Sequence, residues 1–302
     1  MRVLLAIASA AVLLLSACGG DDGGGAGGTI RSDGSSTVGP FMQAAAERFQ
    51  GENEDARVTV GVSGTGGGFE RFCRGETDIS NASRPIDEEE EQVCSAQGIE
   101  FVELPVANDA LTVVVNPEND WATCLTVEQL KKIWEPGSKV SSWKDVDPSF
   151  PDEPVKLYGP GTDSGTFDYF TDEINGEEGA SRTDYSASED DNVIVRGVEG
   201  DPGALGYFGF TYFEENEDSL KALEIDSGDG CVEPSAETAQ SGEYKPLSRP
   251  LFVYVKKESL DRPEVRDFVE FTLDNSGEIA ETARFIPATE EQVSEARSAI
   301  AR

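Results

Sequence analysis

Histidine is absent from this chain of 302 residues. The chain therefore has no Ser-His-Asp or Cys-His catalytic arrangement and no histidine-ligated metal site. Basic residues are also few, because 24 Lys and Arg stand against 59 Asp and Glu, for a formal net charge of −35. Nucleic acids and anionic membrane surfaces are bound through Lys and Arg, so this composition disfavours both partners. Hydrophobic residues, at 37%, suffice for a globular fold, and the length allows about two domains.

Long apolar runs are scarce, and the clearest one lies near the N-terminus. It extends from Val3 to Leu15, follows the single positive charge of Arg2, and is too short to span a bilayer as a helix. The next residues, LSAC, resemble a bacterial lipoprotein signal, in which the cysteine becomes the lipidated first residue; an ordinary secretory signal is the alternative. We therefore expect a signal peptide over residues 1–17 and a flexible, glycine-rich tether over 18–28. Lipid on Cys18 would hold the protein outside the cytoplasm, at the cell membrane.

Cysteine usage agrees with export. Apart from Cys18 there are four cysteines, which allow three pairings. Outside the cytosol we expect them to be oxidised, and we predict the pairs Cys73–Cys94 and Cys124–Cys231. The alternative is a metal site built from all four thiolates, which their wide spacing without any CxxC pair disfavours.

Short apolar runs alternate with amphipathic stretches along the rest of the chain. The expected strands cover residues 58–62, 100–106, 111–116, 155–158, 204–208 and 251–255, and the expected helices cover 38–50, 67–74, 87–96, 126–133, 165–174, 190–197 and 263–270. Strands interleaved with helices predict an α/β fold with mainly parallel pairing.

Two breaks in this pattern, at residues 116–119 and 243–250, suggest a plan of two lobes. Residues 29–116 and 246–302 would form an outer lobe, and residues 117–245 an inserted second lobe. A single domain with a long excursion is the alternative.

Three clusters of Gly, Ser and Thr lie where helices are expected to begin. They are DGSSTVGP at 33–40, SGTGGG at 63–68 and GPGTDSGT at 159–166. The first turn of a helix has free N–H donors and the positive end of the dipole, and glycine lets the backbone approach a ligand. Several such ends aimed at one cleft would bind a small oxyanion. Helix capping is the alternative for any single cluster, and no cluster has the P-loop pattern.

A fourth polar stretch, DISNASRP at 78–85, contains Arg84. A guanidinium can hold an oxyanion through two parallel hydrogen bonds. The alternative is a surface arginine paired with the acidic residues that follow, Asp87 and Glu88.

Taken together, these stretches resemble the phosphate-binding lipoproteins of bacterial ABC phosphate importers. The matching segments, between about Ile30 and Ala288, are DGSSTVGPF, SGTGGGFERFCRGETDISNASRPI, LPVANDALTVVVNP, LTVEQLKKIW, GTDSGTFDYF, GVEGDPGALGYFGFTYF and PLSRPLFVYV. The resemblance implies an α/β, two-lobe type II periplasmic-binding-protein fold with the ligand cleft between the lobes. It further implies a non-enzymatic, monomeric receptor, without cofactor or metal, that captures inorganic phosphate and delivers it to the permease subunits of an ABC importer.

The same resemblance implies a set of ligand residues. Matched by position, they are Ser36, Thr37, Thr65, Ser83, Ser164, Gly165 and Thr166. The best-known branch of the family has an aspartate where this chain has Arg84, and an arginine where it has Pro160. We therefore expect Arg84 to supply the positive charge, and Asp163 either to accept a hydrogen bond from protonated phosphate or to orient Arg84.

Three other functions remain as alternatives. The first is a receptor for another tetrahedral oxyanion, such as sulfate, molybdate or a phosphonate. A lipid-anchored phosphohydrolase would need metal ligands or an activated nucleophile, and the chain has neither histidine nor an obvious carboxylate cluster for that purpose. A surface sensor or adhesin would keep the fold without transport.

Overall fold

The structure is a computed structural model, and it describes residues 28–301. The predicted signal peptide, the predicted lipidation site Cys18 and nearly all of the predicted tether lie outside the described residues. Within this range no helix combines the length and the apolar character needed to cross a membrane.

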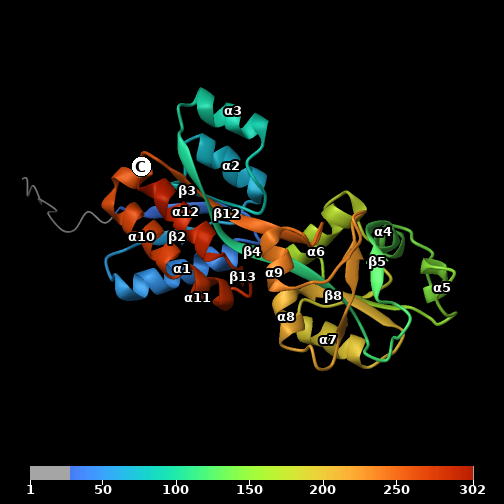
Figure 1. Cartoon of the computed structure of the whole chain (residues 1–302). Helices are drawn as coiled ribbons and strands as arrows, with labels where there is room; N and C mark the ends of the chain where they lie inside the picture. Colours follow the sequence, from blue (N-terminus) through green and yellow to red (C-terminus); the bar gives the residue numbers. More distant parts are fainter. Residues whose placement is uncertain (1–27, 302) are drawn as a thin grey trace, which may run out of the picture.

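Strands and helices alternate along the chain (Figure 1). The strands are β1 (Ile30–Gly34), β2 (Val58–Val60), β3 (Ile79–Ala82), β4 (Phe101–Val115), β5 (Cys124–Thr126), β6 (Lys156–Gly159), β7 (Ser186–Ala187), β8 (Ala204–Gly209), β9 (Lys221–Ala222), β10 (Glu224–Asp226), β11 (Cys231–Val232), β12 (Ser248–Lys256) and β13 (Ile286–Pro287). The α-helices are α1 (Gly39–Glu52), α2 (Thr65–Cys73), α3 (Glu88–Ala96), α4 (Val127–Trp134), α5 (Trp143–Val146), α6 (Gly165–Phe170), α7 (Asp191–Glu199), α8 (Phe210–Glu214), α9 (Ala236–Ser241), α10 (Pro263–Asp274), α11 (Ser276–Thr282) and α12 (Glu290–Ile300). A π-helical turn, η1 (Thr171–Asn175), continues α6, and a 3₁₀ turn, η2 (Ser259–Asp261), precedes α10.

One sheet runs through the whole molecule in the order β2-β1-β3-β12-β4-β8-β6-β7. The α/β class is as predicted, but the expectation of mainly parallel pairing is wrong. β1 pairs in parallel with β2 and β3, and β6 with β7 and β8, whereas β12 and β4 at the centre are antiparallel to their neighbours. The reason is that the chain crosses the molecule once in each direction, along β4 and back along β12.

Side chains alternate between the two faces of the central strands, as the pleat of a strand requires. On β12, Val253 and Val255 join a core with α1 and α10–α12, while Phe252 and Tyr254 pack on the other face with α2. On β8, Leu205 and Tyr207 face one core and Phe208 faces another, which includes α7. Both faces of the sheet are therefore covered by helices.

The hydrophobic core divides along the central strands. A first core includes Ala107 on β4 and Leu251 on β12, and a second core begins at Leu111 and includes Leu247. The strands thus pass from one core to the other over residues 108–110 and 248–250. Figure 1 shows the two groups of elements on either side of this crossing, joined by β4 and β12.

The seven predicted helices are confirmed, with ends shifted by a few residues. The predicted strands at 100–106 and 111–116 form one strand, β4, because Asn108 and Asp109 interrupt the apolar run without ending the pairing with β12. The prediction missed α11 and α12, which pack on the first core. It also missed the strand β1, because that strand is short and mostly polar, with the sequence IRSDG.

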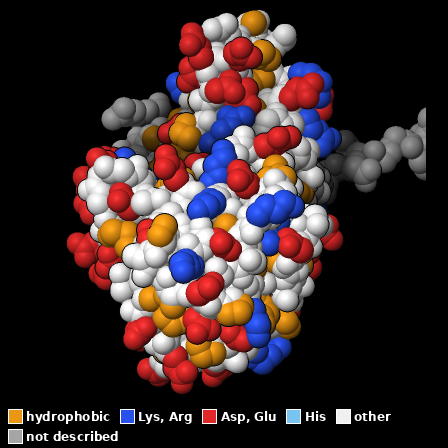
Figure 2. All heavy atoms as spheres, turned by 90° about the vertical axis from the view of Figure 1, so that its right-hand side faces the viewer, with side chains coloured by type: hydrophobic (Ala, Val, Ile, Leu, Met, Phe, Trp, Pro, Cys, Tyr) orange, Lys and Arg blue, Asp and Glu red, His pale blue; other side chains and the backbone are white. Residues whose placement is uncertain are grey.

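Most charged side chains lie on the outside, and a few, such as Asp33, Asp109 and Arg182, are buried. Acidic residues are spread over the face drawn in Figure 2, with lysine and arginine interspersed among them. This face therefore displays charges of both signs to solvent.

Both predicted disulfides are confirmed. Cys73 and Cys94 join the end of α2 to α3 across a separation of 21 residues. Cys124 and Cys231 join β5 to β11 across 107 residues. The four-thiolate metal site is therefore excluded: the one metal-ligand group among the described residues, Cys124, Glu224 and Cys231, has both its sulfurs in a disulfide.

The two disulfides should differ in their contribution to stability. A cross-link restricts the unfolded chain more when it closes a longer loop, which gives about 5 kcal/mol for Cys124–Cys231 and about 3 kcal/mol for Cys73–Cys94 in the chain-entropy description. We expect the double variant Cys124→Ser/Cys231→Ser to lose more free energy of unfolding in urea than Cys73→Ser/Cys94→Ser. The reverse order would show that local packing around α2 and α3 outweighs loop length.

Candidate functional site

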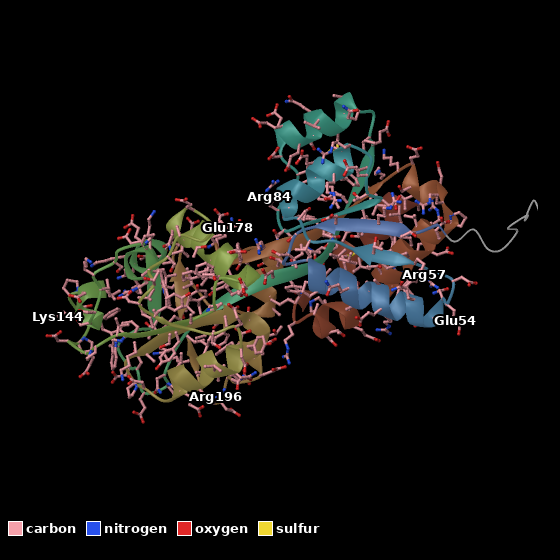
Figure 3. The ribbon with its side chains drawn as sticks, turned by 180° about the vertical axis from the view of Figure 1, so that it is seen from behind. Glu54, Arg57, Arg84, Lys144, Glu178 and Arg196 are labelled. Atoms are coloured by element: carbon pink, nitrogen blue, oxygen red, sulfur yellow. A yellow bond between two sulfur atoms is a disulfide. The ribbon has the colours of Figure 1, made fainter. Side chains whose placement is uncertain are left out.

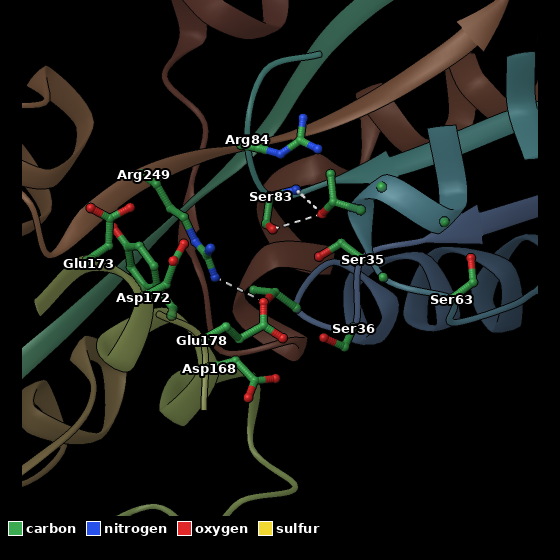
Figure 4. A pocket seen from close by; sticks show the side chains of 17 residues that line it. Ser35, Ser36, Ser63, Ser83, Arg84, Asp168, Asp172, Glu173, Glu178 and Arg249 are labelled. Carbon is green, nitrogen blue, oxygen red and sulfur yellow. Dashed lines mark hydrogen bonds between the residues drawn. The ribbon is translucent and has the colours of Figure 1, made fainter. Parts of the chain in front are cut away.

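A cavity of about 410 Å³ lies between elements of the first core and elements of the second (Figure 4). From the first-core side it is lined by Ser35–Thr37, Ser63–Gly67, Ser83 and Arg84. From the second-core side it is lined by Gly165, Asp168, Tyr169, Asp172, Glu173 and Glu178, and Arg249 reaches it from β12. The cavity thus brings together residues from all three Gly/Ser/Thr clusters and from the fourth polar stretch.

The beginnings of α1 and α2 face this cavity. Val38 and Gly64 occupy the N-cap positions, and neither helix has a capping hydrogen bond from its N-cap side chain. Ser35 Oγ accepts from the N–H of Val38 at 3.4 Å, so local capping accounts for Ser35 of the first cluster but not for the second cluster. The hydroxyls of Ser36 and Thr65, with the N–H groups in the first turn of α2, are available to an anion.

Close backbone packing places these two helix starts beside each other. Gly34 has φ +143°, and a Cβ on it would lie 2.2 Å from the carbonyl oxygen of Asn81. A Cβ on Gly68 of α2 would lie 2.5 Å from Cα of Gly34. The second Gly/Ser/Thr cluster is also joined to the first by a hydrogen bond, because Ser63 Oγ donates to Asp33 Oδ1 at 2.8 Å. Glycine at positions 34 and 68 is therefore a packing requirement.

Ser83 completes the first-core wall. Its Oγ lies 3.0 Å from Thr65 Oγ1, and its N–H donates to the same oxygen at 3.3 Å. Both side chains are half-buried. Because one of these hydroxyls donates to the other, the pair leaves one hydroxyl proton free to donate to a ligand beside the start of α2.

The third cluster behaves differently from the first two. Ser164 is the N-cap of α6, and its Oγ accepts from the N–H of Thr166 at 3.2 Å, so capping does explain this serine. Only Gly165 of this cluster lines the cavity, and a Cβ on it would lie 3.1 Å from Thr37 Oγ1. Thr166 lines a neighbouring cavity instead. Asp163 is exposed and lines neither, and its N–H donates to Glu189 Oε1 at 3.4 Å.

Arg84 is engaged away from the helix starts. Its two terminal nitrogens each donate to a carboxylate oxygen of Glu90 at 2.8 Å, and this pairing raises the pKa of Arg84. Figure 4 shows its guanidinium pointing away from Ser35 and Ser36. The pairing resembles the alternative considered from the sequence, with Glu90 as the main partner and Asp87 at 3.9 Å.

Arg249 is a cavity residue that the sequence analysis did not single out. Its Nη2 donates to Thr37 Oγ1 at 3.1 Å, and Figure 4 shows it pointing toward the first-core wall. A signal was present: Arg249 is one of two cations, with Lys245, in the 243–250 break, where the chain was expected to cross between lobes.

Two contacts fix the Arg249 side chain. Asp109 Oδ2, on β4, accepts from Nε and Nη2 at 3.4 and 3.3 Å. The Tyr169 ring lies under the guanidinium, with 3.6 Å from Cζ to the ring centroid. Burial raises the pKa of Asp109, and the charge of Arg249 opposes that shift. The guanidinium is thus held at the crossing by groups from β4 and α6.

Carboxylates form the opposite wall of the cavity. Asp168, Asp172, Glu173 and Glu178 come from α6, η1 and the loop after it. Burial, followed by the charge of Glu178, raises the pKa of Asp168, while Arg249 lowers it. Burial and the neighbouring Asp172 likewise raise the pKa of Glu173. Figure 3 shows Glu178 and Arg84 on opposite sides of the cavity region.

The site therefore combines hydrogen-bond donors on one wall with acceptors on the other. Helix N–H groups, hydroxyls and one guanidinium suit a small oxyanion. A carboxylate with a raised pKa suits a ligand that itself carries a proton.

Comparison with known proteins agrees with this chemistry. Residues 20–276 match the PBP superfamily domain. The chain is 50% identical to Protein SphX of Synechocystis over 266 residues, covering 87% of this chain and 79% of the relative. It is 41% identical to phosphate-binding protein PstS of Staphylococcus saprophyticus over 273 residues, covering 90% and 84%.

Solved structures share the fold. The crystal structure of a possible phosphate binding protein from Planctomyces limnophilus superposes with a TM-score of 0.87 at 50% identity, covering 91% of this chain and 98% of that one. PstS from Borrelia burgdorferi superposes with a TM-score of 0.68 at 24% identity, covering 86% and 99%.

The packing of α2 against β1 can be tested with two glycines of the same helix. Gly68→Ala would push a methyl group into the backbone of Gly34, and we expect it to lower the free energy of unfolding by about 1–3 kcal/mol. Gly66→Ala is the matched control, because the nearest atom to its Cβ is 3.8 Å away. Urea denaturation measures both, and equal stabilities would contradict the packing requirement.

Proposed function

Because the chain belongs to the PstS-type phosphate-binding proteins of the PBP superfamily, we propose that it is a receptor for inorganic phosphate. It binds the anion in the cavity between the two cores and hands it to the permease subunits of an ABC importer. The observation that supports this most strongly is the convergence of two helix starts and Arg249 on one cavity.

The proposed binding works through short-range donors, which is how a chain of net charge −35 can hold an anion. Taking a phosphate out of water is costly unless every oxygen is hydrogen-bonded. The turn before α1 and the start of α2 supply N–H groups, and Ser36, Thr65 and Ser83 supply hydroxyls. Gly165 adds the start of α6 from the other side, without a side chain in the way.

Arg249 takes the role that the sequence analysis gave to Arg84. It faces Thr37 at the base of the cavity, while Arg84 is occupied by Glu90 at the edge. The proposed ligand set is therefore Ser36, Thr37, Thr65, Ser83, Gly165 and Arg249. Ser164 and Thr166 act behind it, by shaping the start of α6.

Asp168 takes the role proposed for Asp163. Asp168 lines the cavity. Burial raises its pKa and the charge of Arg249 lowers it, so the Asp168 carboxylate interacts electrostatically with that guanidinium. An ionised Asp168 accepts a hydrogen bond from a protonated phosphate oxygen. Fully ionised sulfate has no proton to donate and would be repelled.

The two-lobe division is part of the same proposal. The predicted lobes, residues 29–116 with 246–302 and residues 117–245, are kept in this proposal with their boundary moved to the crossing residues 108–110 and 248–250, because Leu111 and Leu247 already belong to the second core. These crossing segments of β4 and β12 serve as the hinge. A ligand that contacts both lobes favours a closed state by its differential affinity for that state. Closure removes water and strengthens the hydrogen bonds to phosphate.

The remaining features concern location and assembly. We infer that lipid on Cys18 anchors a monomeric receptor to the outer side of the cell membrane, with residues 18–28 as the tether. The two disulfides agree with an oxidising compartment. The protein acts as a receptor and not as an enzyme, and it needs no cofactor.

Titration calorimetry of the chain that starts after Cys18 tests ligand and selectivity together. We expect one phosphate per chain at pH 7 and no detectable sulfate binding. Asp168→Asn should reduce the preference for phosphate over sulfate by about tenfold or more, the effect of one charge-assisted hydrogen bond. Asp163→Asn is the control and should leave the preference unchanged. Equal binding of both anions by the wild type would favour a general oxyanion receptor.

The source of the positive charge is tested by comparing the two cavity arginines. Arg249→Ala, combined with Asp109→Asn so that no unpaired carboxylate stays buried, should weaken phosphate binding by about 10- to 100-fold. Arg84→Ala should change affinity by less than about threefold, because Arg84 is exposed and paired with Glu90.

One further variant and a folding control complete this comparison. Asp109→Asn alone separates the loss of Arg249 from the loss of its partner, and thermal unfolding verifies that each variant is folded. If Arg84→Ala weakened binding more than the Arg249 variant, the assignment in the sequence analysis would be the right one.

A further inference from the structure

Arg284 has an unusual backbone conformation. It is the one non-glycine residue with positive φ, at 62°, among residues 28–301. It follows the end of α11, where the N–H of Phe285 donates to the Ala280 carbonyl at 2.8 Å and that of Arg284 to Glu281 at 3.1 Å. Helices that end in this way favour glycine at the left-handed position. The presence of arginine there calls for a role of its side chain.

That side chain reaches from the end of α11, on the first core, to α8, which belongs to the predicted inserted lobe and packs beside β8 and β4. Phe210 of α8 shares a small apolar cluster with Ala110 on β4 and Ile286 on β13. The guanidinium pairs with the Glu215 carboxylate and lies 4.7 Å from the centroid of the Tyr212 ring. In the other direction, Thr211 Oγ1 donates to the Arg284 carbonyl at 3.1 Å. Three contacts of one residue therefore join the two sides; we call Arg284 with Thr211, Tyr212 and Glu215 the clasp.

The clasp lies across a second cavity from the proposed phosphate ligands. This cavity, of about 280 Å³, is lined by Arg284, Thr211 and Tyr212, and also by Ser36, Thr37 and Gly165. The last three residues also line the first cavity, so they stand between the two cavities. A rotation of one lobe about an axis that does not pass through the clasp therefore changes both the distance between Thr37 and Gly165 and the geometry of the clasp.

We propose that Arg284 is a positioning residue for phosphate binding, which holds the lobes so that the starts of α1 and α6 stay in register across the ligand site. The inference rests on the proposed function. Arg284 touches none of the proposed ligand groups through a hydrogen bond, and it acts by restricting the relative movement of the lobes.

A neighbouring carboxylate supplies an independent readout. Asp191, at the start of α7, lines the same cavity. Burial raises its pKa to about 6, the charges of Asp190 and Glu189 add to that shift, and Arg284 opposes it. Removing the guanidinium should therefore raise the pKa of Asp191 further.

Arg284→Gly is the sharpest variant, because it removes the side chain and suits the left-handed backbone. We expect an unchanged or higher Tm, a broader distribution of lobe arrangements in small-angle X-ray scattering without phosphate, and phosphate dissociation faster by roughly three- to tenfold in stopped-flow tryptophan fluorescence, the range for a peripheral ion pair with an aromatic contact. Arg284→Lys should recover part of the effect, and Glu215→Gln should reproduce part of it.

Arg297→Ala is the matched control. Arg297 has a comparable exposure and pairs with Asp274 at 2.7 Å, but both residues belong to helices on the first core. It should leave dissociation, scattering and the NMR-measured pKa of Asp191 unchanged. Wild-type scattering and dissociation in Arg284→Gly, or tighter phosphate binding, would overturn the proposal. If the wild type bound no phosphate, the proposed function would fail, while scattering and the Asp191 pKa would still test the clasp.

Discussion

The crossing of β4 and β12 between the two cores is the constraint on which the site depends. Both strands pass from one core to the other within a few residues, and their antiparallel pairing continues through the crossing. Asp109 on β4 and Arg249 on β12 meet there. Because the guanidinium also contacts Thr37 and the Tyr169 ring, this one side chain touches both sides of the cavity and the strands between them.

The helix starts of the site could be predicted from the sequence because each depends only on residues that are neighbours in the chain. Glycine and small hydroxyl residues before an amphipathic stretch mark a helix start that can bind an anion, and the starts of α1, α2 and α6 lie where expected. The pairing of the cysteines was also predicted correctly. The long, antiparallel central strands were not predicted, because the polar pair Asn108 and Asp109 looks like a break in an apolar run.

Long-range pairing explains the two side chains that were assigned differently. Arg249 and Thr37 are 212 positions apart, so no spacing rule connects them. Arg84 was expected to bind the anion, with pairing to Asp87 and Glu88 as the alternative, yet Glu90, six positions further along, holds it with two hydrogen bonds. Glu90 lies in the first turn of α3, and the sequence analysis did not consider it as a partner. Asp163 and Asp168 illustrate the same difficulty, since only the start of α6 decides which of them faces the cavity.

A crystal structure of the chain with inorganic phosphate would test the central claim most directly. The account predicts one phosphate in the cavity, within hydrogen-bond distance of the α1 and α2 starts, Gly165 and the Arg249 guanidinium, with Asp168 accepting from a phosphate oxygen. A phosphate bound through Arg84, with Arg249 still directed only at Asp109 and Thr37, would contradict it.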